Sequence, residues 1–241
     1  MRILIISDIH ANLVAFETVL ADAKGEWDVI WCLGDLIGYG PNPNECVALL
    51  REYEHISLSG NHDWAALGKL DIQNFNIEAQ AAIQWTRNAL TDQTRDYLDA
   101  LPTKMVREPF TLAHASPRQP VWEYILDPYT AATNFEYFDT PYCLVGHTHV
   151  PALFEIQDNS IIARVPLYRE PIHLNDARLI INPGSVGQPR DSDPRAAYAL
   201  LDTDSMDWVH RRISYPVGKT QELMRQHGMP PRLIERLEFG W

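Results

Sequence analysis

Polar side chains of the kinds that bind metal ions follow several apolar, strand-like runs of this chain. The first half shows this three times: Asp8 and His10 follow residues 2–6, Asp35 follows residues 28–33, and Asn61 and His62 follow residues 55–58. In open α/β sheets, ligand sites lie beyond the carboxyl ends of the strands. The chain is therefore expected to place these residues together around one site at the edge of a sheet.

Histidines continue the pattern in the second half. His114 follows the apolar run 110–113, and His147 and His149 follow residues 142–145. Residues two apart in an extended chain project to the same side. His147 and His149 can therefore face one ion, and the same spacing recurs in the Asp-Ile-His sequence after the first apolar run.

The N-terminal part of the chain reads as a parallel strand-helix-strand unit. Residues 2–6 are a β-branched and leucine run, which is typical of a strand buried on both faces. Residues 12–23 predict an amphipathic helix with Asn12 as its N-cap, and residues 28–33 predict the next strand. The crossover of such a unit is expected to be right-handed.

Helices and short strands fill the rest of the chain. Helices are predicted over 44–53, 76–90, 92–100, 216–228 and 230–238. Short strands, divided by Pro, Gly, Asn and Asp, are predicted over 104–107, 110–113, 142–145, 151–156, 160–165, 178–182, 196–201 and 207–213. Residues 1–241 are expected to form a single domain with a C-terminal helical extension over about 216–241. The helices of that extension would pack either on this domain or on a second copy, in a homo-oligomer.

The composition is that of a soluble globular protein, and it restricts the partners. Apolar residues make up 46% of the chain and charged residues 22%. The formal net charge of −12 argues against a nucleic-acid polymer as the main partner, because proteins that bind one present a basic surface. No apolar run approaches the about 20 residues of a membrane span, and the three cysteines lack zinc or redox spacing. We expect a cytoplasmic protein with no membrane association.

The candidate ligands suit a centre with two metal ions. The set comprises Asp8, His10, Asp35, Asn61, His114, His147 and His149, with His62 beside it. Mixed imidazole and carboxylate ligands favour Mn, Fe, Zn, Ni or Co over Ca or Mg. The set is too large for one tetrahedral ion, whereas two divalent ions that share a bridging carboxylate would use every member. Such centres activate water for in-line attack on phosphorus.

The charge of such a centre suits a phosphate ester. Two carboxylates and one bridging hydroxide only partly neutralise two divalent cations, so the centre keeps a positive charge that attracts a phosphodiester or a phosphomonoester. An aspartate in place of Asn61 would cancel that charge. A neutral amide ligand at this position therefore fits an anionic, phosphorylated small molecule as the substrate.

The motifs resemble those of the calcineurin-like metallophosphoesterases. The resemblance rests on Asp8-Ile-His10, Gly34-Asp35, Gly60-Asn-His-Asp63, His114 and Gly146-His-Thr-His149, in that order. Asn182-Pro-Gly-Ser-Val-Gly187 resembles a turn of the small prokaryotic phosphodiesterase and phosphatase branch of that family. The resemblance implies an α/β (α+β) fold, a four-layer αββα sandwich of two packed mixed β-sheets flanked by helices, with a dinuclear metal site at the strand ends.

The resemblance also implies roles for the candidate residues. One metal would be held by Asp8, His10, Asp35 and His149, and the other by Asp35, Asn61, His114 and His147. A metal-bridging hydroxide would attack phosphorus, and His62 would donate a proton to the leaving oxygen or stabilise the transition state as a cation. The stretch after Asp35 lacks the Asp and Arg of protein Ser/Thr phosphatases. Protein phosphatase activity is therefore not expected, and Asp63 is the one carboxylate next to His62 in sequence.

Tyr39, Arg118 and Arg190 are further candidates for contact with the substrate. Tyr39 would stack on a base or pack over its own loop. Each arginine would hold a phosphate as a fork donor or would form a structural ion pair. The aromatic stretch 122–129 would either overhang the site or cover the core.

The sequence as a whole predicts a metal-dependent phosphoester hydrolase. A small phosphodiester or a nucleotide is the favoured substrate, because a diester needs less positive charge than a dianionic monoester and few arginines lie near the motifs. The alternatives are a phosphomonoesterase, a dinucleoside polyphosphate hydrolase and, in a different class, a catalytically inactive metal-binding scaffold. A nuclease that acts on long nucleic acids is disfavoured by the net charge of −12.

Overall fold

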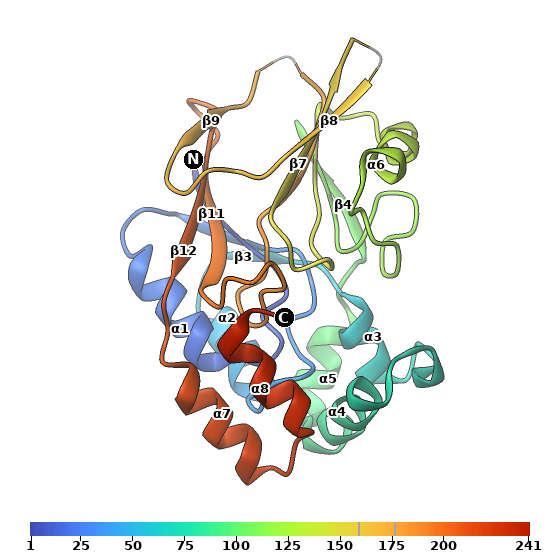
Figure 1. Ribbon diagram of the computed structural model, residues 1–241, viewed down its shortest axis with the longest axis vertical. Helices are drawn as coiled ribbons and strands as arrows, with labels where there is room; N and C mark the ends of the chain where they lie inside the picture. The colour runs from blue at the N-terminus through green and yellow to red at the C-terminus, as the bar shows by residue number, and fades with distance from the viewer. Residues whose placement is uncertain (159, 176) are drawn as a thin grey trace.

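Two six-stranded mixed β-sheets pack face to face in the computed structural model, which describes residues 1–158, 160–175 and 177–241 (Figure 1). The first sheet has the order β3 (His55–Ser57), β2 (Val29–Cys32), β1 (Arg2–Ile6), β11 (Ala196–Asp202), β12 (Asp207–Ile213) and β9 (Pro171–His173). The second has the order β4 (Lys104–Arg107), β5 (Phe110–Ala113), β6 (Tyr142–Leu144), β10 (Leu179–Asn182), β7 (Ala152–Gln157) and β8 (Ser160–Arg164).

Strand β1 shows why the sheets stack. Ile3, Leu4, Ile5 and Ile6 are all fully buried, as the continuous apolar run predicts. Ile3 and Ile5 pack toward the second sheet, and Leu4 and Ile6 pack toward the helices on the outer face, because successive side chains of a strand alternate between its faces. The parallel pairing of β1 with β2, and of β2 with β3, confirms the predicted strand-helix-strand unit.

Helices cover both outer faces of the paired sheets. The outer face of the first sheet packs against α1 (Leu13–Asp22), α2 (Pro43–Leu50) and α5 (Asp92–Asp99), and that of the second against α6 (Pro128–Asn134). These layers confirm the four-layer sandwich that the resemblance implies. Asn12 caps α1 as predicted, since its side chain accepts a hydrogen bond of 3.2 Å from the N–H of Ala15. Within the described residues, no helix has both the length and the apolarity to cross a bilayer.

Two short helices, one at the candidate site and one on the outer face of the second sheet, are absent from the elements predicted from the sequence. Helix α3 (Asn61–Leu67) begins at the Gly60-Asn-His-Asp63 motif itself, and α6 begins inside the aromatic stretch 122–129. Both are 7 residues long, and a helix of two turns shows too little periodicity to be read from the sequence. Helix α4 (Ile77–Ala89) follows α3 after a 3₁₀ turn at Ile72–Asn74.

The C-terminal helices α7 (Val217–Gln226) and α8 (Pro231–Phe239) form a hairpin that packs on this chain's own α1 and α4. Leu237 and Met224 belong to the same apolar cluster as Ala82 of α4 and Tyr39. The C-terminus lies beside the loops at the strand ends (Figure 1), where the N–H of Ser192 donates a 2.9 Å hydrogen bond to the carbonyl of Gly240. The predicted extension therefore covers the end of the sandwich at which the candidate ligands lie.

Candidate metal centre

The candidate ligands gather at the carboxyl ends of strands from both sheets. Asp8 and His10 follow β1, Asp35 follows β2, and Asn61 follows β3 in the first sheet. In the second sheet, His114 follows β5, and His147 and His149 follow β6. All of these side chains are at most 3% exposed. The stacking of the two sheets thus brings together motifs that lie up to 141 positions apart in the sequence (His149 against Asp8).

Six of the seven candidate ligands form two buried groups that share Asp35. One group contains Asp8, His10, Asp35 and His149, and the other contains Asp35, His114 and His147, with ligand atoms within 4.8 Å of one another. Asn61 joins the second group, because its Oδ1 lies 3.2 Å from Nε2 of His114. The two groups coincide with the two ligand sets that the resemblance implies.

The donor atoms of these groups fit cations. Oδ2 of Asp35 and Nε2 of His147 are buried, and neither has a hydrogen-bond partner among the described residues. Nε2 of His10 lies 3.0 Å from Nε2 of His149, although two imidazole lone pairs at that distance repel each other unless a proton or a cation lies near both. Buried polar atoms without partners are costly, and divalent cations held by these residues would satisfy them.

Backbone carbonyls fix the orientation of three of the imidazole rings. The Nδ1 atoms of His10, His114 and His149 lie 3.2, 3.0 and 2.5 Å from the carbonyl oxygens of Ile37, Leu33 and Gln188. In the neutral rings of His10 and His149, an Nδ1–H that donates to a carbonyl leaves Nε2 with a free lone pair, whereas His114 offers one only after losing the proton that Asp35 favours. Each Nε2 then faces the shared centre, which is the arrangement of metal-binding histidines whose second nitrogen is hydrogen-bonded to the protein.

Most of the candidate ligands have a strained backbone conformation, which sets the direction of their side chains. Asp8, His10, Asp35, His147 and His149 have φ angles of 53°, 49°, 50°, 64° and 62°, in the left-handed region that residues other than glycine rarely adopt. The extended geometry that the sequence analysis assumed for the Asp-Ile-His and His-Thr-His segments is therefore wrong. Tight left-handed turns bring the side chains together instead. Strain of this kind persists where surrounding contacts over-determine the conformation, and it concentrates at functional sites.

The Asn182–Gly187 turn makes contacts that hold the strained backbone of the candidate ligands. The hydroxyl of Ser185 donates to the carbonyl of Asp8 at 2.8 Å, and the N–H of Gly187 donates to the same carbonyl at 3.0 Å. The side-chain amide of Asn182 donates to the carbonyl of Gly146 at 2.7 Å. These hydrogen bonds hold the backbone of the loops after β1 and β6 in place. The Asn182–Gly187 motif by itself indicates only the resemblance, and its contacts with these loops depend on the tertiary structure.

Burial controls the charge of the imidazole groups. It lowers the pKa of His62 to about 4 and that of His147 to about 3, and it holds the pKa values of His10 and His149 well below their usual range. These rings are therefore neutral near pH 7 and can act as metal ligands. Burial acts in the same direction on His114, but the Asp35 carboxylate 3.4 Å from Nε2 outweighs it and raises the pKa of that ring to about 9.

His62 lies at the start of α3, beside the two ligand groups. Its ring centroid is 4.2 Å from that of Tyr39 and 5.2 Å from that of Phe75. Gly38 leaves room for it, because a Cβ at that position would lie 2.8 Å from Nδ1 of His62. The φ of Gly38, +94°, also requires glycine. In the described part of the chain, Nδ1 of His62 has no hydrogen-bond partner, so the ring is held by packing.

Asp63 does not contact the ring of His62. Its two carboxylate oxygens accept hydrogen bonds from the N–H groups of Ile37, at 3.1 Å, and Gly60, at 2.8 Å. Asp63 is therefore a structural cap that ties the start of α3 to the loop after Asp35. Gly60 is needed in this turn because a Cβ there would collide with Oδ1 of Asp35.

A cavity of about 310 Å³ opens onto the two ligand groups. Its lining includes two of the three proposed substrate contacts, Tyr39 and Arg190. Arg118 is not part of that lining, and it forms an ion pair with Glu123 instead. Arg190 therefore lines the cavity and Arg118 does not, although both follow candidate ligands in the sequence.

The aromatic stretch 122–129 both overhangs the site and covers the core. Trp122 and Tyr124 line the cavity, and the ring centroid of Tyr124 is 4.0 Å from that of His147. Ile125 is buried in the apolar cluster on the outer face of the second sheet. Arg236 of α8 also lines the cavity, and the sequence analysis missed it. No motif marks this arginine, and only the packing of the C-terminal hairpin brings it to the site.

Comparisons with known proteins agree with this geometry. A family model described as the calcineurin-like phosphoesterase superfamily domain matches residues 1–206. The uncharacterized protein MJ0912 of Methanocaldococcus jannaschii is 37% identical over 244 residues, which cover 99% of this chain and 98% of that protein. The crystal structure of a metallophosphoesterase from Sphaerobacter thermophilus is 48% identical, with a TM-score of 0.92 over 100% of this chain and 99% of that one.

A structure with lower sequence identity is similar to this chain in its fold. The hypothetical protein PH1004 from Pyrococcus horikoshii OT3 is 18% identical and superposes with a TM-score of 0.78, covering 100% of this chain and 98% of that one. The family model ends before the α7–α8 hairpin, whereas the matches to these relatives cover 98% or more of both chains. The hairpin is therefore shared with these relatives but lies outside the segment that the family model describes.

Proposed function

Because the chain belongs to the calcineurin-like phosphoesterase superfamily, we propose that it is a metal-dependent hydrolase of small phosphodiesters or nucleotides. The observation that carries the proposal is the pair of buried ligand groups joined by Asp35. The name of the Sphaerobacter thermophilus relative, a metallophosphoesterase, supports the same activity.

The chemistry of the donor set decides how the metals would be held. Asp8, His10, Asp35 and His149 would hold one divalent transition-metal ion, and Asp35, Asn61, His114 and His147 would hold the other. When bound, two such ions supply Lewis-acid chemistry: they neutralise phosphoryl oxygens and lower the pKa of water. Mn, Fe, Zn, Ni and Co all suit these ligands, and Asn61 contributes a donor atom without adding negative charge.

His62 is the residue proposed to assist the leaving group. It lines the cavity next to both ligand groups, and its ring is neutral near pH 7 because burial lowers its pKa to about 4. A neutral imidazole still carries one N–H, which His62 would hold toward the leaving oxygen of the ester. The packed rings of Tyr39 and Phe75 keep His62 in place and exclude water from one side of it.

The shape of the site favours a small substrate. The cavity of about 310 Å³ is walled by aromatic side chains of Tyr39, Phe75, Trp122 and Tyr124. A wall of this kind suits a flat leaving group such as a nucleoside and leaves little room for a polymer. The net charge of −12 also disfavours a long nucleic acid.

A paired assay tests the proposal. The protein is stripped with a chelator, reloaded with Mn²⁺, and given bis(p-nitrophenyl) phosphate and p-nitrophenyl phosphate side by side. We expect metal-dependent turnover of the diester. Turnover of the monoester alone would replace the proposal with a phosphomonoesterase. No turnover of either ester, with two metals bound per chain, would contradict a general phosphoesterase and favour an inactive metal-binding scaffold.

A further inference from the structure

Two arginines from distant parts of the chain meet at the mouth of the candidate metal centre. Arg190 lies in the loop between β10 and β11, and Arg236 lies on α8, yet both line the cavity. Neither guanidinium forms an ion pair with a carboxylate side chain in the part of the chain that the structure describes. The chain carries 32 acidic residues against 20 basic ones. Within the described residues, both arginines therefore line the cavity without an ion pair to a carboxylate side chain.

Several arginines elsewhere in the chain bind either carboxylates or main-chain oxygens, and Arg87 and Arg178 are examples of the second kind. Arg2, Arg164, Arg195, Arg211 and Arg212 each pair with an aspartate or a glutamate, and Arg118, the other arginine near the site, pairs with Glu123. Like charges that lie close together repel each other, and partial burial strengthens that repulsion. Two guanidinium groups that line one cavity and form no ion pair with a carboxylate side chain of the described residues are suited to bind an anion there.

Arg190 is held in position by neutral groups. One of its terminal nitrogens donates a 2.9 Å hydrogen bond to Oε1 of Gln188, and its guanidinium carbon lies 5.7 Å from the ring centroid of Tyr39. Its Nε is buried and has no hydrogen-bond partner among the described residues. Gln188 also accepts the Nδ1–H of His149 through its backbone carbonyl, so one residue orients both a candidate ligand and this arginine.

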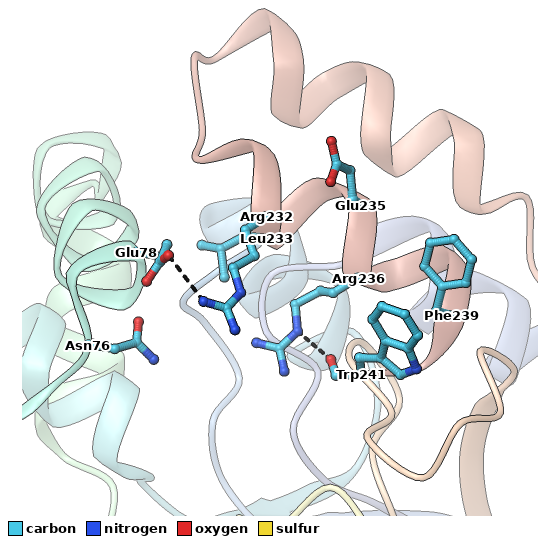
Figure 2. Close-up of a pocket in the computed structure, with 8 residues that line it drawn as sticks. All are labelled: Asn76, Glu78, Arg232, Leu233, Glu235, Arg236, Phe239 and Trp241. Carbon is cyan, nitrogen blue, oxygen red and sulfur yellow. Dashed lines mark hydrogen bonds and ion pairs between the residues drawn. The ribbon is translucent and has the colours of Figure 1, made fainter.

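Arg236 reaches the cavity from α8. Figure 2 shows it leaving α8 on the same side as Arg232, with its Nε donating to a main-chain oxygen of Trp241, the last residue of the given sequence. That bond leaves the two terminal nitrogens for another acceptor. Partial burial, together with the positive charge of Arg190, lowers the pKa of Arg236 to about 10, so the group stays charged near pH 7.

Arg236 also joins the site to a second cavity. This outer cavity of about 510 Å³ lies along α8, and Arg236 and Asn76 line both cavities. Its wall contains the stacked rings of Phe239 and Trp241, whose centroids are 4.7 Å apart (Figure 2). Arg236 therefore lies at the boundary between the cavity at the metal centre and the outer cavity.

We propose that Arg190 and Arg236 form a second anion-binding position, which holds a phosphate group of the substrate other than the one that is hydrolysed. The substrate class is then a small organic molecule that carries at least two phosphate groups. The inference rests on the proposed function, because it places the reacting phosphate at the candidate metal centre. It also revises one argument from the sequence, since Arg236 raises the number of arginines near the site.

Phosphate binding to the metal-free protein tests the position without catalysis. Inorganic phosphate is titrated calorimetrically into the wild type, Arg236→Gln, Arg236→Lys and Arg232→Gln. Arg232 is the matched control: it lies one turn away on α8 and lines only the outer cavity, its side chain is 83% exposed, and it pairs with Glu78. We expect Arg236→Gln to weaken phosphate binding about tenfold or more, Arg236→Lys to weaken it less, and Arg232→Gln to match the wild type.

The outcomes that would overturn the inference are distinct. Equal phosphate affinity in the wild type and Arg236→Gln, or an equal loss in Arg232→Gln, would show that Arg236 does not bind the anion. Circular dichroism and the thermal midpoint of each variant verify that the helices are intact. Arg236→Lys keeps the test valid if Arg236→Gln does not fold, because a lysine retains the charge and loses only the planar fork.

Inhibition kinetics then separate this inference from the proposed function. Adenosine 5′-monophosphate and adenosine 3′,5′-bisphosphate compete with bis(p-nitrophenyl) phosphate on the Mn²⁺-loaded protein. We expect the bisphosphate to inhibit about tenfold more tightly in the wild type and in Arg232→Gln, and this ratio to fall toward one in Arg236→Gln. A ratio of one in the wild type would contradict the second phosphate position. Failure to hydrolyse any phosphoester, with Arg236-dependent phosphate binding intact, would contradict the proposed function alone.

Discussion

The backbone N–H of His62 donates a hydrogen bond of 2.8 Å to Oδ1 of Asp35. This bond leaves Oδ2 of Asp35 directed at the ligand groups, 3.6 Å from Nε2 of His10 and 3.4 Å from Nε2 of His114. One carboxylate therefore fixes the start of the helix that carries His62 and also joins both ligand groups. The position of the proposed proton donor and the position of the proposed bridging ligand are coupled through a single side chain.

We predict that Asp35→Asn removes metal binding. The substitution keeps the shape of the side chain and its hydrogen bond to His62 but removes the charge that both ligand groups share. We expect metal affinity to fall by more than the roughly 10–100-fold typical of an outer-shell partner. Metal content after dialysis, measured by mass spectrometry, checks this. Asp96→Asn, at an exposed carboxylate, is the control, and two metals retained by Asp35→Asn would contradict the bridging role.

His62→Asn is predicted to separate catalysis from metal binding. His62 belongs to neither ligand group, so both metals should remain bound. The loss of a proton donor to the leaving oxygen should lower kcat for the diester by roughly 10²–10⁴-fold. Steady-state kinetics with metal content measured on the same sample check this, and an unchanged kcat at full metal occupancy would contradict the assignment.

Asp63→Ala is predicted to destabilise the fold. The substitution leaves the buried N–H groups of Ile37 and Gly60 without acceptors and removes the cap of α3. An unsatisfied buried donor costs about 1–3 kcal/mol, so we expect the free energy of unfolding to fall by roughly 2–4 kcal/mol. Urea unfolding of the metal-free protein measures this. Asp96→Ala is the exposed control, and similar midpoints for the two variants would show that the cap contributes little.

His210 is predicted to make the protein acid-sensitive. Burial, and then the charge of Arg212, lowers the pKa of His210 from 6.5 to about 4, and the nearby Asp193 carboxylate only partly opposes this. Between these pH values the unfolded chain binds a proton that the folded protein does not bind. Stability from this group is therefore present above pH 6.5 and is lost as the pH falls toward 4.

The free energy of unfolding should fall by up to about 3 kcal/mol between pH 6.5 and 4 because of His210, since each pKa unit corresponds to about 1.36 kcal/mol. His210→Gln does not titrate in this range, so the fall in unfolding free energy between pH 6.5 and 4 should be correspondingly smaller in the variant. Chemical unfolding of both proteins at several pH values measures the two slopes. Identical slopes would show that His210 does not contribute to the acid sensitivity.

Local sequence patterns determined most of the secondary structure and pointed to the residues that the structure gathers as candidate ligands. The apolar run 2–6 becomes β1, and Asn12 caps the helix after it, because strand burial and helix capping depend on neighbouring residues. Asp8, Asp35 and His114 each follow an apolar run, and the structure brings them to one edge. Position at the end of a strand is encoded locally, and parallel strands of a sheet end at a common edge.

Only the tertiary structure decided which arginine faces the site. Arg118 and Arg190 both follow ligand-bearing segments, but Glu123 engages the first, while the second lies unpaired beside Tyr39. Arg236 lies on an ordinary amphipathic helix, and no local signal distinguishes it from Arg232. The packing of the C-terminal hairpin on α1 and α4 places Arg236 in the cavity at the metal centre and leaves Arg232 largely exposed at the outer cavity. Contacts between residues far apart in the chain decide which arginine side chain lines the cavity. The sequence around each arginine therefore does not predict its position.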